Sequence, residues 1–173
     1  IDDAQDVDIP FYVTAHELAH QWWGLQLVAA NVKGKHMILE SLSQYSALMV
    51  LKKEFPEEKI NQFLADQMDR YLETRKSTSK EEVALELVED ESYIYYNKGA
   101  INLYALQDYI TEDSVNSALC KFLSDWNSVN KQYKKDRFPT TEDLLGYFEA
   151  VTPDSLQYVL TDLFRKAIVY DNQ

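Results

Sequence analysis

Apolar side chains recur at helical spacing along most of this chain. In residues 57–75, one stripe is formed by Ile60, Phe63, Leu64, Met68 and Leu72. The 173 residues include only four Gly and four Pro, too few for the many turns of a β-sandwich or barrel. We therefore predict a mainly α fold in a single domain, which this length is sufficient to form.

Breaks in the helical pattern divide the chain into predicted elements. Asp8 is expected to cap the first helix, with Pro10 in its first turn. Residues 81–93 are expected to form a short strand or an extended segment, and 167–171 a strand. Thr152 is expected to cap the last helix. The predicted helices cover residues 10–27, 37–54, 57–75, 95–110, 114–126, 141–151 and 153–166.

Charge and cysteine content exclude several classes of function. Seventeen basic against 29 acidic residues give a net charge of −12, which argues against a nucleic-acid partner. Cys120 is the only cysteine, so any zinc site must use His and carboxylate ligands. No apolar stretch approaches the roughly 20 residues that span a bilayer. The chain begins at Ile1 without a signal-peptide pattern, and we expect it to be part of a longer protein.

The sequence His16-Glu17-Leu18-Ala19-His20 indicates a metal centre. Residues four apart on a helix differ by about 40° in direction and lie one turn apart, so both imidazoles can reach one ion. Glu17 is placed to act as general base on a metal-bound water. A catalytic zinc site needs a third protein ligand, and Glu40 is the candidate. Two of the three histidines belong to this motif, whereas His36 is expected to be a solvated loop residue.

Three sequence blocks resemble the aminopeptidase N family of gluzincins. Residues 16–24 are similar to its signature, and Glu40-Ser41-Leu42-Ser43-Gln44-Tyr45 is similar to its second block, whose glutamate is the third zinc ligand. Tyr96-Asn97-Lys98-Gly99-Ala100 resembles its Tyr-x-Lys-Gly block, whose tyrosine binds the oxyanion. The neighbouring Tyr95 is the alternative, and only the spacing to Lys98-Gly99 favours Tyr96.

The resemblance implies the helical portion of a thermolysin-like gluzincin catalytic domain. It implies His16, His20 and Glu40 as ligands of one Zn²⁺, Glu17 as the base and Tyr96 as the oxyanion donor. Residues 1–173 would form one catalytic-domain fragment. Its expected parts are zinc-binding helices at 10–55, the tyrosine segment at 90–110 and C-terminal helices at 114–166.

Three departures from the family pattern affect substrate contacts rather than the ligands. The spacing between His20 and Glu40 is one residue longer than usual, and Leu39 and Ser41 replace the usual Asn and Gly. The extra residue falls in the predicted loop 29–35, where an insertion leaves both helices in place. The family's Gly-x-Met-Glu-Asn block, which binds the substrate's amino group, is absent from these residues. We expect it to precede Ile1 or to have been lost.

Three functions remain open from the sequence. The first is a peptidase that removes N-terminal residues from peptides, and the second is a thermolysin-type endopeptidase. The third is a zinc domain that binds peptides or couples to a transporter without cleavage. Residues 103–109 resemble a bacterial branch of the family that is fused to an ABC-permease-like membrane protein. That resemblance implies a position on the outer side of a bacterial inner membrane; the oligomeric state is not predicted.

Overall fold

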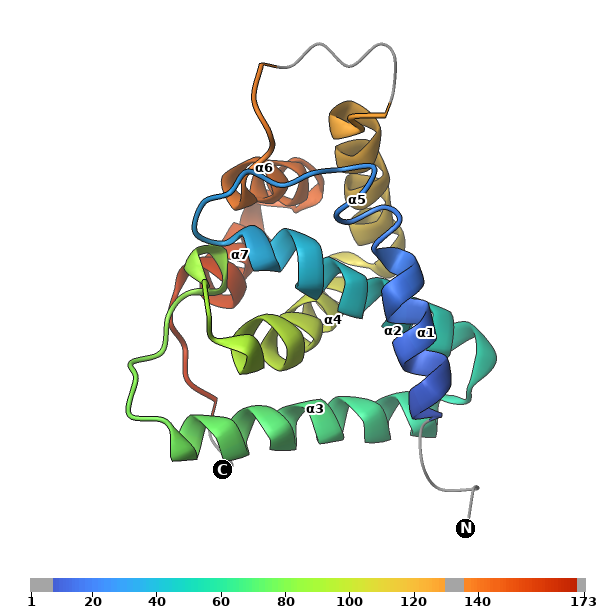
Figure 1. The fold of residues 1–173 in the computed structure, drawn as a ribbon, viewed down its shortest axis with the longest axis vertical. Helices are drawn as coiled ribbons and strands as arrows, with labels where there is room; N and C mark the ends of the chain where they lie inside the picture. The colour runs from blue at the N-terminus through green and yellow to red at the C-terminus, as the bar shows by residue number, and fades with distance from the viewer. Residues whose placement is uncertain (1–7, 130–135, 171–173) are drawn as a thin grey trace.

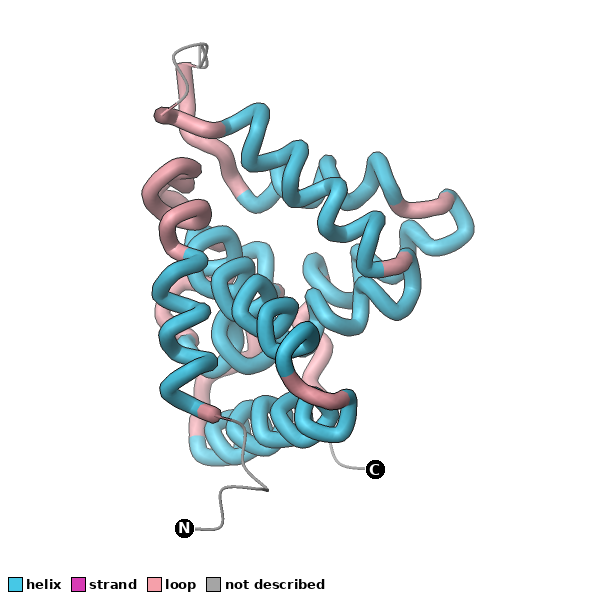
Figure 2. The backbone as a smooth tube through the Cα atoms, turned by 90° about the vertical axis from the view of Figure 1, so that its right-hand side faces the viewer, coloured by secondary structure: helices cyan, strands magenta, loops and turns pink. Residues whose placement is uncertain are grey.

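Helices make up nearly all of the regular structure. The computed structural model describes residues 8–129 and 136–170, and within them Figure 2 shows helices and loops without strands. The mainly α prediction is therefore confirmed. The α-helices are α1 (Ile9–Ala19), α2 (Leu42–Glu54), α3 (Glu57–Ser77), α4 (Gly99–Ile110), α5 (Glu112–Trp126), α6 (Thr141–Val151) and α7 (Gln157–Leu160). Asp8 accepts a hydrogen bond from the Phe11 amide, as expected of the predicted cap.

Five short turns of other helical types lie between these helices or after the last of them. Three are π-helical turns, in which the backbone hydrogen bonds run from residue i to i+5: η1 (Met37–Ser41), η3 (Ile94–Lys98) and η5 (Thr161–Arg165). Two are 3-10 turns, η2 (Leu85–Leu87) and η4 (Asp154–Leu156). Because η1 leads directly into α2 and η3 into α4, the predicted helices 37–54 and 95–110 each begin with a π-turn.

Helices α2 and α4 pass through the middle of the molecule. Figure 1 shows α3 lying across one end and α5 with α6 at the other, with α1 alongside α2. The core side chains Leu42, Leu103, Leu106 and Phe122 are fully buried. The pairs α1–α2, α2–α4 and α5–α6 are in direct contact. This packing fixes the start of α2 and the start of α4, where the candidate site lies.

Helix α1 is shorter than predicted. The predicted helix extends to residue 27, but α1 ends at Ala19 with His20 as its C-cap. There the chain tightens into 3-10-like bonds, from the Gln21 amide to the Leu18 carbonyl and from the Trp22 amide to the Ala19 carbonyl. Gly24 then adopts φ 131°, a conformation that other residues rarely adopt. The helix therefore ends immediately after the motif.

The expected C-terminal strand is not formed, and the expected extended segment contains a turn. Residues 81–91 form a loop containing η2, and residues 92 and 93 are helical. Residues 167–170 are irregular, with residue 171 outside the described part. Their backbone groups are satisfied by side chains instead of a neighbouring strand: Lys98 donates to the Ile168 carbonyl, and the Tyr170 amide donates to the Tyr71 hydroxyl. The Thr152 cap is also wrong, because its hydroxyl donates to the Phe148 carbonyl.

We predict that Asp143 stabilises the start of α6. Its carboxylate accepts from the Thr140 amide and pairs with Arg137 at 2.6 Å. Arg137 is the main cause that lowers the Asp143 pKa to about 2. Asp143→Asn should lower the free energy of unfolding by about 1 kcal/mol at pH 7. Because the folded pKa is depressed, this stabilisation is present above pH ~4 and disappears as the pH falls towards ~2.

Urea denaturation between pH 2 and 7 measures this effect. Asp113→Asn is the matched control, since it removes the same charge from the first turn of α5, where Thr111 caps the helix. An equal loss of stability for both variants at pH 7 would contradict the role of Asp143.

Candidate metal centre

Two imidazoles from the end of α1 meet on one side of the helix. His16 lies in the helix and is 8% exposed, and His20 caps it. Their ring centroids are 4.8 Å apart, with an angle of 89° between the planes. The four-residue spacing therefore brings the two rings together even though the helix ends at Ala19.

Glu40 completes a group of three ligand-type side chains. It lies on η1, which packs beside α2 and η3. Its Oε2 atom is 3.4 Å from Nε2 of His16 and 3.5 Å from Nε2 of His20. One ligand atom from each residue lies within 4.8 Å of the other two. The structure thus brings together the three residues predicted as ligands.

The spacing of these atoms fits a zinc ion. Two ligands that are each about 2.0–2.1 Å from tetrahedral zinc are separated by about 3.3–3.4 Å. Oε2 of Glu40 is buried and has no partner with regular hydrogen-bond geometry among the described residues. A buried carboxylate oxygen without a hydrogen bond is costly unless a cation compensates for it. The donor set of two imidazoles and a carboxylate is also one that zinc accepts.

The surroundings of His20 direct one of its nitrogens at Glu40. Nδ1 of His20 is 3.0 Å from the Trp23 carbonyl, which can only accept a hydrogen bond. The other contact of Nδ1, at 3.1 Å, is the Ser43 hydroxyl, which donates its own proton to the Leu39 carbonyl. Nδ1 therefore carries a proton, and Nε2 is the nitrogen that faces Glu40. Such support of a histidine through its second nitrogen is usual at metal sites.

Electrostatics favour an ionised Glu40 and a neutral Tyr96. Burial alone would raise the pKa of Glu40, but the contact with His16, the charge of His20 and the Tyr96 hydroxyl together lower it. Burial raises the pKa of Tyr96, and the negative charge of Glu40 raises it further. The Tyr96 hydroxyl thus keeps its proton and donates to Glu40.

The position of Tyr96 distinguishes it from Tyr95. The Tyr96 ring centroid is 5.9 Å from that of His16. The Tyr95 ring instead stacks on His36, at 4.7 Å with 20° between the planes. His36, expected to be a solvated loop residue, is therefore part of an aromatic stack, and its Nδ1 is buried. Tyr96 is the tyrosine beside the three predicted ligands.

Glu17 lies on α1 between the two histidines and is exposed to solvent. It is not one of the three clustered ligand-type residues. Its negative charge adds, after burial and the charge of Glu40, to the causes that raise the pKa of Tyr96. This placement leaves its carboxylate available to a water molecule rather than to the ion.

Lys98 is held in a structural ion pair. Its ammonium is 2.6 Å from Glu82, and both side chains are almost completely buried. Tyr71 and Tyr170 lie beside the ammonium, with ring centroids at 5.6 and 5.1 Å. The structure therefore gives Lys98 a buried ion pair with Glu82. Glu82 gives no sequence signal of its own, since it lies within a generally acidic segment.

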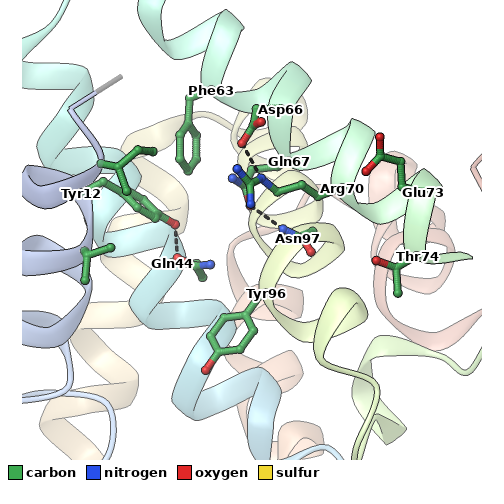
Figure 3. A pocket seen from close by; sticks show the side chains of 12 residues that line it. Tyr12, Gln44, Phe63, Asp66, Gln67, Arg70, Glu73, Thr74, Tyr96 and Asn97 are labelled. Atoms are coloured by element: carbon green, nitrogen blue, oxygen red, sulfur yellow. Dashed lines mark hydrogen bonds and ion pairs between the residues drawn. The ribbon is translucent and has the colours of Figure 1, made fainter. Parts of the chain in front are cut away.

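A cavity opens beside the candidate ligands. Its volume is about 540 Å³, and it extends between α1, α2, α3 and η3. Tyr12 and Gln44 lie in its wall one helical turn from His16 and Glu40, and Tyr96 belongs to the same wall. Figure 3 shows the Tyr12 hydroxyl directed at Gln44, with Phe63 and Gln67 across the cavity on α3. The cavity therefore begins next to the three ligand-type residues.

Comparison with known proteins identifies the family. The model of the peptidase family M1 domain matches residues 3–149, which is most of the chain. "Endoplasmic reticulum aminopeptidase 2" of Homo sapiens is 26% identical over 124 residues, which cover 68% of this chain and 13% of that protein. "Probable aminopeptidase 1" of Sulfurisphaera tokodaii is 28% identical over 142 residues, 72% of this chain and 18% of that protein.

The fold agrees with that of solved members of the family. An M1 zinc metallopeptidase from Deinococcus radiodurans superposes with a TM-score of 0.69 at 20% identity, covering 92% of this chain and 34% of that chain. The chain thus spans 13–18% of the two curated relatives and about a third of the solved structure. The family match and the shared helical fold show that this chain belongs to peptidase family M1.

Proposed function

We propose that this chain is the metal-binding part of a zinc-dependent peptidase that removes N-terminal residues from peptides. The observation that carries the proposal is the spacing of 3.4 and 3.5 Å between Glu40 Oε2 and the two histidine nitrogens, which fits a tetrahedral ion. His16, His20 and Glu40 would hold the metal. When bound, zinc supplies Lewis-acid polarisation of a carbonyl group and a water that is nucleophilic at neutral pH.

Glu17 is the proposed general base. Its exposed carboxylate takes a proton from the attacking water as the oxygen of that water bonds to the scissile carbonyl carbon. The same carboxyl group then donates the proton to the departing amine as the C–N bond breaks. Glu17 thus accepts and releases the same proton, and it returns to its ionised state.

Tyr96 is the proposed donor to the carbonyl oxygen. Its hydroxyl keeps its proton because burial and the charge of Glu40 raise its pKa. A neutral hydroxyl can donate a hydrogen bond to the negative charge that develops on this oxygen. Removing one such donor typically lowers kcat by about 10²–10³.

The cavity beside Tyr96 is the proposed location of the peptide beyond the cleaved bond. It combines the aromatic side chains of Tyr12 and Phe63 with the amides of Gln44, Gln67 and Asn97. Amide groups can pair with a peptide backbone, and the aromatic rings can contact an apolar side chain. Asp66, Arg70 and Glu73 also line the cavity, and the substrate class that we propose for this mixed lining is a peptide.

Removal of N-terminal residues is favoured over internal cleavage because the two curated relatives described above are named aminopeptidases. The thermolysin-type endopeptidase remains the second candidate, since it uses the same arrangement of two histidines and a glutamate. We also propose attachment to a permease-like membrane protein, which rests on the resemblance of residues 103–109. Within residues 8–129 and 136–170, no helix is both long enough and apolar enough to cross a membrane.

The first prediction of the proposed function concerns the metal. The purified protein should contain one zinc ion, and His20→Ala should remove most of it because an ion with one fewer protein ligand binds far more weakly. His36→Ala is the control, since it removes a histidine that stacks on Tyr95 outside the ligand group. Metal analysis after dialysis measures the zinc content of the wild type and of both variants. Equal zinc content in the two variants would contradict the ligand assignment.

The second prediction concerns Glu17. Glu17→Gln should keep the zinc content and lower kcat by at least about 10²-fold, because the amide cannot accept the proton. Cleavage of aminoacyl fluorogenic substrates by the full-length protein, with and without a chelator, is the measurement. Hydrolysis at the original rate would exclude Glu17 as the base. A wild-type protein that binds zinc and peptides without cleavage would support the non-catalytic alternative.

The third prediction separates the two peptidase candidates. Peptides with a free N-terminus should be shortened one residue at a time, whereas N-acetylated copies should remain intact. Mass spectrometry of the products distinguishes the outcomes. Internal cleavage of both peptides would indicate the endopeptidase.

A further inference from the structure

Glu40 and Tyr96 both lie on π-helical turns, and these turns are in contact. Glu40 is in η1 and Tyr96 in η3. π-turns are rare, and a longer i to i+5 bond changes which carbonyls the following amides reach. In η3 the Gly99 amide points at the carbonyls of Ile94 and Tyr96, on either side of Tyr95. The carbonyl of Tyr95, between these two acceptors in the sequence, receives a hydrogen bond from a side chain of η1.

Ser41 supplies that hydrogen bond. Its hydroxyl donates to the Tyr95 carbonyl at 2.6 Å, across 54 residues of sequence. Ser41 is the residue after Glu40, and Tyr95 is the residue before Tyr96, so one bond joins the neighbours of both site residues. The side chain of Ser41 is completely buried. Water is therefore unable to replace the hydroxyl easily, and the bond is protected from competition.

Gly99 makes room for this contact. A Cβ atom at Gly99 would lie 2.2 Å from the Ser41 hydroxyl oxygen and 2.7 Å from its Cβ. Both distances are far shorter than van der Waals contact, and Ser41 has no space to move because it is buried. The absence of a side chain at Gly99 is thus required by the serine at position 41. The two residues form one contact between the start of α2 and the start of α4.

We propose that Ser41, seated against Gly99, is a positioning residue that sets the place of the Tyr96 hydroxyl relative to Glu40. The inference rests on the proposed function and adds to it a residue that does not itself touch the substrate. Ser41 acts through the backbone of Tyr95, so its loss would let η3 shift. A displacement of about 1 Å of a catalytic group can lower the rate about 10²-fold.

The central test is a double-mutant cycle in the full-length protein. Ser41→Ala should lower kcat by about 10- to 100-fold, with KM within about threefold and zinc content unchanged. Tyr96→Phe should lower kcat by more, and Ser41→Ala should have little further effect in that background, because both act through one hydroxyl. Thr152→Val is the matched control: it removes another buried hydroxyl that donates to a carbonyl, far along the chain from the site.

Two kinetic results and one metal measurement would overturn the proposal. The first is a kcat for Ser41→Ala equal to that of Thr152→Val. The second is a full multiplicative loss when Ser41→Ala is added to Tyr96→Phe, as a general loss of folding would give. The third is a loss of zinc from Ser41→Ala, which would place the effect at the metal.

A second pair of variants covers the case in which Ser41→Ala does not fold. Gly99→Ala should lower the stability of the protein because the new Cβ atom would clash with the Ser41 side chain. Adding Ser41→Gly should remove this clash and restore stability in the double variant. The double variant should fold and still have the low kcat, since it lacks the hydroxyl. A fully active double variant would contradict the proposal.

Hydrogen exchange separates this proposal from the proposed function. Amides of residues 94–100 should exchange faster in Ser41→Ala than in the wild type, and Thr152→Val should leave them unchanged. If the wild-type protein cleaves no peptide, the proposed function fails. The exchange measurement then still tests whether the Ser41 hydroxyl holds η3 in place against η1. Unchanged exchange in Ser41→Ala would overturn it whatever the activity.

Discussion

A carboxylate oxygen enclosed by two imidazole nitrogens is the constraint on which the rest of the site depends. Oε2 of Glu40 is buried between His16 and His20, at a cost that only a cation or well-formed hydrogen bonds can offset. The contacts of α1 and η1 with α2 hold these residues in position. Tyr96 reaches the same carboxylate from η3, so three segments of the chain, α1, η1 and η3, meet at this group.

The positions of the histidines follow from local geometry, and that of Glu40 does not. Two histidines four residues apart face one side of any helix, which makes their convergence predictable. Glu40 is separated from them by an irregular loop; it was the candidate because a catalytic site needs a third ligand, and the resemblance to a family block supported that choice. The structure shows why the longer loop is tolerated: residues 28–36 lie between elements whose own packing is fixed by the core.

Tertiary contacts determine the features that the sequence did not predict. The π-turns at Glu40 and Tyr96 are continuous with regular helices, and their apolar pattern is that of an ordinary helix. One contact between the turns, from the Ser41 hydroxyl to the Tyr95 carbonyl, joins residues 54 positions apart and is visible only in three dimensions. The predicted strand at residues 167–171 failed for a related reason, because the buried Lys98 binds the Ile168 carbonyl. Helix α1 ended early because the chain turns sharply after His20.

A crystal structure with anomalous data collected at the zinc absorption edge tests the central claim most directly. The account predicts one strong anomalous peak among His16, His20 and Glu40, at about 2.0–2.2 Å from Nε2, Nε2 and Oε2. A peak at His36 or on the acidic surface, with none between the three side chains, would contradict it.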